Sequence, residues 1–385
     1  MWKVQLFELN YDERETRAVS EVLESRWLTM GQRTRDFESA FEEFLGAGQC
    51  TAVSSATGAL HMALLALGIG PGDEVIVPAL TFVADINVVK MVGAEPILAD
   101  CESLNLWNID VHDVERRITN RTKAVLCVHY AGYSCRMDEL TALCERHGLR
   151  LIEDAAHAPG ARYGQAALGT IGDIGCFSFF TNKNLSVGEG GMLSTGDEGL
   201  HARFRSLRSH GMTSLTLDRH EGRAISYDVL EPGLNYRIDE IRAALGLVQL
   251  DKLPEGNRRR GELMKLYQRR LEPVDGVTWP FDGYSAGANS FHICPVLLDS
   301  GIDRDAILMA LKERGVQASI HYPAFGGFAA YPHLDTSDTP IAEQISQREL
   351  TLPLFPTMGD AAVEIVCDAL TACLEEAREL KTAAG

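Results

Sequence analysis

The sequence has no surplus of basic residues, no long apolar run and no paired cysteine motif. Its 385 residues include 36 Lys and Arg against 54 Asp and Glu, a formal net charge of −18. No basic face is therefore available to attract a phosphodiester backbone, and we expect no nucleic-acid partner. No apolar stretch approaches the roughly 20 residues of a membrane span, and residues 1–11 lack a signal-peptide core. We expect a cytoplasmic protein without a membrane partner.

Recognisable metal-binding motifs are lacking as well. The nine cysteines are odd in number, form no CxxC pair and have no histidine at ligand spacing. We interpret them as small buried side chains in a reducing compartment. The sequence therefore predicts no metal site.

What is present is an alternation typical of an α/β protein. The composition, 45% hydrophobic and 23% charged, is that of a folded globular chain, and the length suits two domains. In the first two-thirds, short apolar runs alternate with helix-length segments, which predicts a mostly parallel sheet flanked by helices. The predicted strands are residues 75–78, 95–99, 124–129, 150–153, 175–179 and 192–194, and helices are expected at 59–67, 137–146 and 200–209.

The pattern changes near residue 250, where we place a domain boundary. The final third predicts a smaller C-terminal α+β domain, residues 251–385, packed on a large domain, residues 1–250, with the cleft between them as the ligand site. A helix at 239–253 leads into this domain. Within the domain we expect helices at 258–271, 303–314 and 360–380 and strands at 290–298 and 318–321.

Four polar segments follow strands, at the places where open α/β sheets bind ligands. The first, residues 51–60, has small residues that run into a helix, so free N–H groups and hydroxyls could bind a phosphate. An ordinary helix cap by Ser55 or Thr57 explains the same pattern. The second, residues 150–157, ends an apolar strand with Asp154. A buried carboxylate there needs a cationic or proton-donating partner, such as a pyridinium nitrogen, unless Asp154 only caps a following helix.

The third segment, residues 175–191, places Lys183 in a turn after a strand that delivers Ser178, and three glycines follow. Glycines let the backbone pass close to a bulky group. Aromatic and small neighbours can hold Lys183 partly desolvated, which lowers its pKa and frees the amine for a Schiff base. Most loop lysines are nevertheless simply solvated, and only the surrounding segments favour the reactive interpretation.

The fourth segment, residues 233–239, precedes a predicted helix. Asn235 and Arg237 could bind an anion there, or Arg237 could pair with Asp239 or Glu240. The spacing alone does not choose between these interpretations.

Together these segments resemble the DegT/DnrJ/EryC1/StrS family of sugar aminotransferases, which depend on pyridoxal phosphate (PLP). The resemblance implies the PLP-dependent transferase fold type I, the fold of aspartate aminotransferase. It covers nearly the whole chain and rests on residues 68–78, 81–82, 93–96, 153–158, 183–185, 188–191, 208–211, 234–237 and 321–323.

The resemblance implies a role for each matched residue. Lys183 matches the lysine that forms the covalent link to PLP and then moves a proton between the substrate carbon and the cofactor. Asp154 matches the acid that keeps the pyridine nitrogen protonated, so that the ring accepts electrons. Phe82 matches the aromatic residue that stacks on the ring, and His157 matches a position near the ring hydroxyl. We therefore expect Lys183, Asp154 and His157 to be catalytic.

Other matched positions concern the phosphate and the assembly. Ser178, Ala56 and Thr57 match the residues that bind the phosphate, with Ala56 where the family usually has Gly. Asn235 matches a phosphate contact that comes from the other subunit. The resemblance thus implies a homodimer with shared active sites.

The reaction implied is a ping-pong transamination. An amino acid, with L-glutamate expected, converts PLP to pyridoxamine phosphate, and the amine then passes to the ketone of a nucleotide-linked deoxysugar. Transfer to a cyclitol or another cyclic ketone is an alternative, as is a catalytically silent regulatory member of the fold. A dehydratase is disfavoured, because those relatives replace the lysine with histidine and this chain has Lys183.

The substrate-facing loops are expected at residues 26–33, 212–227 and 322–333. Ala324 and Phe325 depart from the relatives, many of which carry a second histidine further on, so the sugar is left open. The candidate substrate contacts could each be a packed aromatic, a satisfied histidine or an ion-paired arginine instead; they are Trp27, His210, Arg237, His321 and Tyr322.

Overall fold

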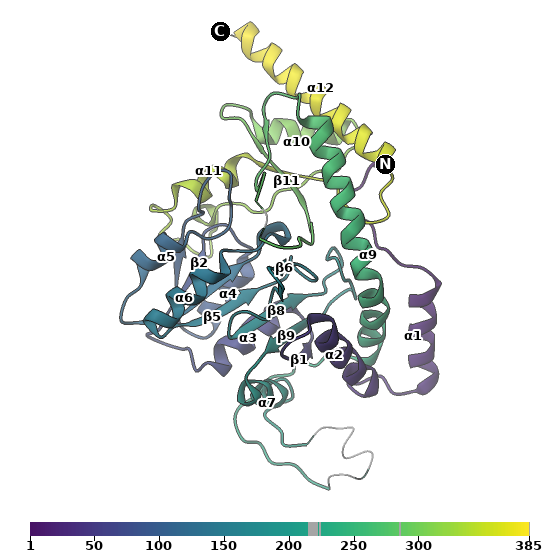
Figure 1. The fold of residues 1–385 in the computed structure, drawn as a ribbon, viewed down its shortest axis with the longest axis vertical. Coiled ribbons are helices and arrows are strands. Elements are labelled where there is room, and N and C mark those ends of the chain that lie inside the picture. Colours follow the sequence, from purple (N-terminus) through teal and green to yellow (C-terminus); the bar gives the residue numbers. More distant parts are fainter. Residues whose placement is uncertain (215–221, 223–224, 285, 385) are drawn as a thin grey trace.

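The structure is a computed structural model that describes residues 1–214, 222, 225–284 and 286–384. A seven-stranded sheet runs through its centre in the order β1-β9-β8-β5-β4-β2-β3 (Figure 1). Within it, β9 is antiparallel to both neighbours and the other pairs are parallel, which confirms the predicted α/β fold with a mostly parallel sheet. The strands are β1 (Gln49–Val53), β2 (Glu74–Pro78), β3 (Glu95–Ala99), β4 (Thr122–Val128), β5 (Arg150–Asp154), β8 (Ile174–Ser178) and β9 (Gly191–Thr195).

Helices cover both faces of this sheet. On one face α3 (Ala56–Ala66), α4 (Val83–Met91) and α7 (Glu198–Leu207) form a core with strand residues that include Val75. The core on the other face includes the next strand residue, Ile76, as expected of a strand that is apolar on both sides. The helices of that second face are α2 (Gln32–Leu45), α5 (Val111–Arg117), α6 (Met137–His147) and the first half of α9 (Glu240–Leu271).

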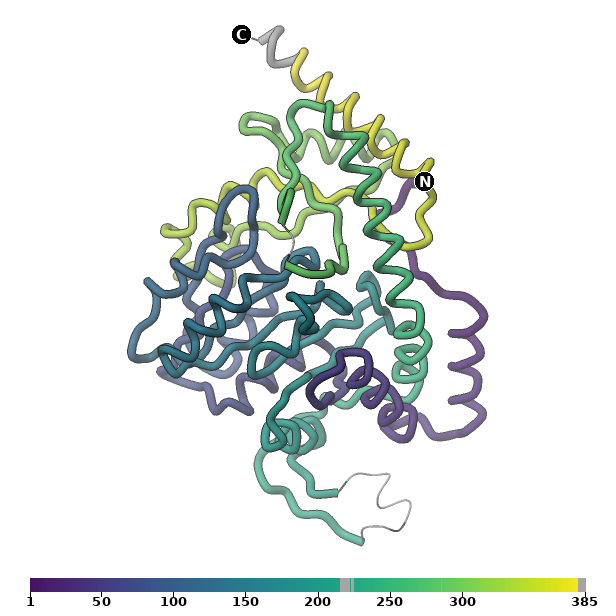
Figure 2. The backbone as a smooth tube through the Cα atoms, viewed as in Figure 1, coloured from purple at the N-terminus to yellow at the C-terminus, as the bar shows by residue number. Residues whose placement is uncertain are grey.

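A smaller sheet is formed by strands that follow α9 in the chain. Its antiparallel strands β10 (Val277–Thr278), β11 (Cys294–Leu298) and β12 (Glu349–Leu352) share a third core with α10 (Arg304–Glu313) and α12 (Asp360–Ala384). The N-terminal segment joins this part, because Val4 pairs with Val316 and lies in the same core (Figure 2). The remaining elements are α1 (Glu13–Ser25), α11 (Pro340–Arg348), β6 (Arg162–Tyr163), β7 (Ala166–Ala167) and the 3-10 turns η1 (Tyr130–Gly132) and η2 (Phe325–Gly327).

Two sequence predictions in the final third are wrong. The helices expected at 239–253 and 258–271 form the single helix α9, which continues through Pro254. The proposed division into domains 1–250 and 251–385 stays a prediction, and residue 250 lies inside this helix. The strand expected at 318–321 is reduced to one bridge, Ser319 to Thr351. Among the described residues, no helix has the length and apolar character needed to cross a membrane.

Candidate active site

A cavity of about 330 Å³ lies at the carboxyl ends of β5 and β8, where the helices α3 and α4 begin. Open α/β sheets bind their ligands at this edge. The cavity collects most of the residues that the sequence singled out. Its lining consists of Ser55, Ala56, Thr57, Leu60, Thr81, Phe82, Ala84, Val128, Asp154, Ala156, His157, Ser178, Phe180, Asn182, Lys183, Glu189, Gly190, His321 and Tyr322.

Lys183 extends its amine into this cavity from the turn after β8. Its backbone N–H donates to the carbonyl of Phe180 over 2.9 Å, which fixes the turn. Burial lowers the pKa of the Lys183 amine to about 8, and the negative charge of Asp154 opposes this shift. A lysine with a lowered pKa has more of its amine neutral, and therefore nucleophilic, near neutral pH than a solvated lysine.

His292, which the sequence analysis did not single out, contacts this amine. Its Nε2 lies 3.3 Å from Lys183 Nζ, and its Nδ1 lies 3.0 Å from Asn184 Oδ1. The amide nitrogen of Asn184 already donates to Asn257 Oδ1 and to the Ser290 carbonyl, so Asn184 Oδ1 is an acceptor. His292 must therefore carry its proton on Nδ1, which leaves the Nε2 lone pair to accept a hydrogen bond from the Lys183 amine.

Asp154 ends β5 and is 6% exposed. Its Oδ1 accepts the N–H of Ala156 over 2.8 Å, and no helix follows, so the interpretation as a helix cap does not hold. Burial raises the pKa of Asp154, while the Ala156 bond and the charge of Lys183 act in the opposite direction. A proton-bearing or cationic ring nitrogen would satisfy this carboxylate.

A second carboxyl group, Asp85 of α4, lies close enough to Asp154 for each group to affect the pKa of the other. Asp85 is fully buried; the Thr81 hydroxyl donates to its Oδ2, while Oδ1 has no partner among the described residues. Burial and the neighbouring charge of Asp154 raise the pKa of Asp85 well above its usual range. Asp85 was missed from the sequence, although one carboxylate inside the apolar run of residues 83–89 is a signal that could have found it.

His157 and Tyr322 form another wall. The backbone N–H of Ala131 donates to His157 Nδ1 over 3.2 Å, so the ring proton is on Nε2, which donates to the Tyr322 hydroxyl over 2.8 Å. Burial, together with the charge of Lys183, holds the pKa of His157 well below its usual range. Tyr322 also lies 5.6 Å, centroid to centroid, from Phe82, which is 53% exposed and borders the cavity.

The part of the cavity lining at the start of α3 is suited to an anion. Ser55 caps α3 by accepting the N–H of Gly58 over 3.0 Å, so the predicted cap is present, and the first turn of α3 borders the cavity together with Ser178. Backbone N–H groups at a helix start favour phosphate. Gly191 allows the close approach of β9, because a Cβ atom there would lie 2.5 Å from the Ser55 carbonyl carbon and 2.6 Å from the Ala56 nitrogen.

Four predicted site residues lie outside this cavity in a single chain. They are Trp27, His210, Asn235 and Arg237. Asn235 pairs with Ser209 and Arg237 pairs with Val53 through isolated backbone bridges, and His210 is solvent-exposed. Of the expected substrate loops, residues 212–227 lie partly outside the described residues.

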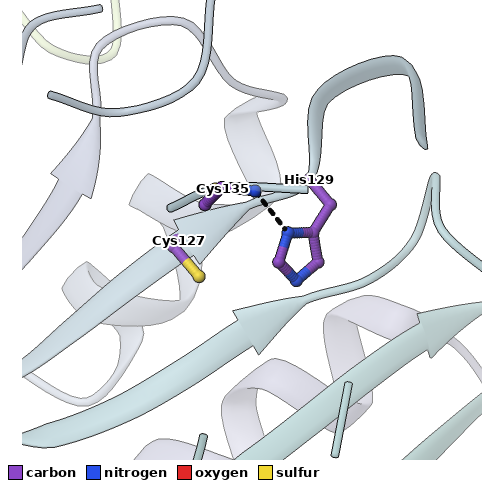
Figure 3. Close-up of side chains that lie close together, drawn as sticks. All are labelled: Cys127, His129 and Cys135. Atoms are coloured by element: carbon purple, nitrogen blue, oxygen red, sulfur yellow. Dashed lines mark hydrogen bonds between the residues drawn. The ribbon is translucent and has the colours of Figure 1, made fainter. Parts of the chain in front are cut away.

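Cys127 of β4 and two residues from the segment after it, His129 and Cys135, come together at the carboxyl end of this strand (Figure 3). The ligand atoms of Cys127, His129 and Cys135 lie within 4.8 Å of one another, in a fully buried cluster that the sequence spacing did not predict. Both ring nitrogens of His129 and the Cys135 thiol already have partners: His129 Nε2 donates to Glu153, His129 Nδ1 accepts the Cys135 N–H, and the Cys135 thiol donates to the Val128 carbonyl. The cluster is thus explained as a hydrogen-bond network, and the absence of a metal stays a prediction.

The residues of the cavity fit a PLP molecule. The buried amine of Lys183 can bind an aldehyde, the carboxyl of Asp154 can hold a ring nitrogen, and the first turn of α3 can bind a phosphate. Fold and site together define a PLP-dependent aminotransferase of fold type I.

The comparisons with known proteins place the chain in a family. The profile of the DegT/DnrJ/EryC1/StrS aminotransferase family matches residues 10–371, and the chain belongs to this family. The family is PLP-dependent, and neighbours of known structure have been solved in PLP and PMP forms. The resemblance drawn from the sequence is confirmed.

Three similar proteins illustrate the relationship. The spore coat polysaccharide biosynthesis protein SpsC of Bacillus subtilis is 40% identical over 367 residues, which are 92% of this chain and 93% of SpsC. The aminotransferase TlmJ from Streptoalloteichus hindustanus superposes with a TM-score of 0.90 at 35% identity, over 98% of this chain and 99% of TlmJ. DesI, solved in the presence of its TDP-sugar product, gives a TM-score of 0.86 at 31% identity, over 97% and 92% of the two chains.

Proposed function

We propose that the protein transfers an amino group from an amino acid, with L-glutamate as the expected donor, to the keto group of a nucleotide-linked deoxysugar. The observation that carries the proposal is the buried Lys183 amine, whose pKa of about 8 suits a nucleophile, beside Asp154 in a cavity that begins at the start of α3. The sugar is supported by relatives that include DesI, which was solved with a TDP-sugar product.

Lys183 and Asp154 would have different roles in the reaction. Lys183 would hold the cofactor covalently and carry the proton that moves at the substrate carbon, with His292 Nε2 accepting a hydrogen bond from its amine. Asp154 would hold the ring nitrogen. When bound, PLP supplies an electron sink for the negative charge that develops on the substrate carbon.

Phosphate binding would fall to the residues at the start of α3. The N–H groups of Ala56 and Thr57, with the Ser178 hydroxyl, would hold the phosphate at the start of α3. Phe82 would cover one face of the ring and His157 would lie near its hydroxyl group, since both side chains border the same cavity.

A panel of nucleotide-linked keto-sugars, each incubated with L-glutamate and purified protein, tests the proposal. We expect a new amino sugar by mass spectrometry together with 2-oxoglutarate, and neither product with Lys183→Ala. Turnover of a cyclitol ketone with no turnover of any nucleotide-linked sugar would show that the acceptor is wrong. PLP-loaded protein that turns over no amino donor would support a regulatory role instead.

We also propose that the active form is a homodimer with shared sites. Asn235 was matched to a phosphate contact from the other subunit, and it lies outside the cavity of its own chain. Lys183→Ala and Asn235→Ala should each be inactive, whereas a refolded equal mixture should recover about a quarter of the activity, because half the dimers are mixed and each has one intact site. An inactive mixture that contains the mixed dimer would contradict shared sites.

A further inference from the structure

A fully buried carboxyl group lies behind the wall of the cavity. Glu349, the first residue of β12, has no exposed surface. Its Oε2 accepts the backbone N–H of His321 over 2.7 Å, and its Oε1 is hydrogen-bonded to the Thr351 hydroxyl. Glu349 is therefore linked to His321, which borders the cavity, in two ways. One link is the direct hydrogen bond to the His321 backbone, and the other passes through the side chain of Thr351.

The second route ends on the imidazole ring. Thr351 Oγ1 lies 2.8 Å from His321 Nδ1 as well as next to Glu349 Oε1. A hydroxyl group has one proton, so Thr351 can donate to Glu349 or to His321 but not to both. Among the described residues, the other ring nitrogen, Nε2, has no hydrogen-bond partner, and the ring borders the cavity.

The proton on Glu349 decides between the two arrangements. If Glu349 is protonated, it donates to Thr351 Oγ1, Thr351 donates to His321 Nδ1, and the His321 proton is on Nε2. If Glu349 is ionised, it accepts from Thr351, and the Thr351 oxygen accepts from a protonated Nδ1, which leaves Nε2 as an acceptor. The tautomer of His321 thus follows the charge on Glu349.

The surroundings favour the protonated form at neutral pH. Burial raises the pKa of Glu349 to about 8, and the hydrogen bonds from Thr351 and His321 and the charge of Arg304 only partly oppose this. Tyr130 and Tyr322 lie close on the cavity side. Burial, with the charge of Lys183, lowers the pKa of His321 to about 3, so the ring is neutral and its tautomer is the variable that remains.

We propose that Glu349 acts through Thr351 as a positioning residue that makes His321 Nε2 a hydrogen-bond donor toward the cavity. Such a donor selects a ligand group that accepts, for example a sugar hydroxyl or carbonyl oxygen or a phosphate oxygen. The identity of that ligand rests on the proposed function, whereas the coupling of Glu349 to the His321 tautomer does not.

The coupling is tested on the cofactor-free protein by ¹⁵N NMR of labelled histidines, with His321→Asn to assign the signal. We expect the Nε2–H tautomer of His321 at neutral pH and a change to the Nδ1–H tautomer as the pH rises through about 8. His157 is an internal control, because its lowered pKa keeps the ring neutral in this pH range and the Ala131 N–H fixes its Nε2–H tautomer.

Two variants extend the test. Glu349→Gln keeps a donor for Thr351 and cannot ionise, so His321 should stay Nε2–H across the range. Thr351→Val removes the relay oxygen, so the tautomer should stop following pH near 8. A wild-type His321 that is Nδ1–H at neutral pH, or that does not change across pH 8 while Glu349→Gln matches it, would overturn the proposal. The wild-type titration decides even if a variant does not fold, and none of these outcomes depends on PLP or on the sugar.

Discussion

Replacement of Asp85 by Asn should change how the stability of the cofactor-free protein depends on pH. Asp85 is fully buried and lies near Asp154. Burial and the negative charge of Asp154 both raise the pKa of Asp85 well above its usual range. A carboxyl group whose pKa is raised in the fold holds its proton more tightly in the folded than in the unfolded chain. Its stabilising contribution is therefore complete below the unfolded pKa of about 3.9 and is lost as the pH rises toward the folded pKa.

Asp85 holds one proton in the folded chain and releases it on unfolding, and this single proton sets how steeply the stability changes with pH. As the pH rises above the unfolded pKa, the wild type should lose up to about 1.4 kcal/mol of unfolding free energy per pH unit relative to Asp85→Asn, for as long as the folded carboxyl group keeps its proton. Glu349 adds its own slope to both proteins, so it cancels in the comparison. Asn keeps the shape of the side chain and an oxygen that can still accept the Thr81 hydroxyl, which limits other losses.

Urea unfolding of the cofactor-free wild type and variant at several pH values is the assay. Ile86→Val serves as a control, because Ile86 is a fully buried neighbour in α4 without a titrating group. That control should lower stability by about 1 kcal/mol at every pH. If the wild-type and Asp85→Asn curves run parallel across the range, Asp85 is ionised in the fold, and its pKa is not raised as the structure implies.

Two further predictions concern the anion end of the cavity and the buried cysteine cluster. Gly191→Ala should destabilise the protein by about 1–3 kcal/mol and weaken PLP binding, because the added Cβ meets the backbone of Ser55 and Ala56 at 2.5–2.6 Å. Gly196→Ala, where a Cβ meets nothing within 4 Å, should change neither the melting temperature nor the PLP titration, and equal effects of the two variants would contradict the packing argument. Elemental analysis should find no stoichiometric zinc, and a chelator should leave PLP binding unchanged; one zinc per chain that disappears in Cys135→Ala would show that the cluster binds metal.

The sheet was predictable where burial on both faces made strands uniformly apolar. The run at 75–78 lies in β2, where every residue is buried, since a strand covered on both sides needs apolar residues at successive positions. β1 was missed because Gln49–Val53 contains Thr51 and small residues that also suit a loop. The helices predicted at 239–253 and 258–271 are one helix, because packing against α1 and α2 keeps α9 continuous through Pro254.

The site was predictable in part, for a similar reason. Lys183, Asp154 and Ser55 stand in segments that favour a ligand only when they are taken together, and the structure brings them into one cavity. His292 and Glu349 come from distant parts of the chain and act through contacts that no spacing encodes. The prediction of a strand at 318–321 is wrong because of such a distant contact. The His321 N–H donates to the Glu349 side chain rather than to the backbone of a neighbouring strand.

The covalent chemistry of Lys183 is tested most directly by reducing the PLP-loaded protein with borohydride, digesting it and locating the cofactor by mass spectrometry. We expect a pyridoxyl phosphate group on the peptide that contains Lys183, and no such group in Lys183→Ala. A stable label on another lysine, or undiminished labelling of the variant, would contradict the assignment of this amine and of the cavity around it.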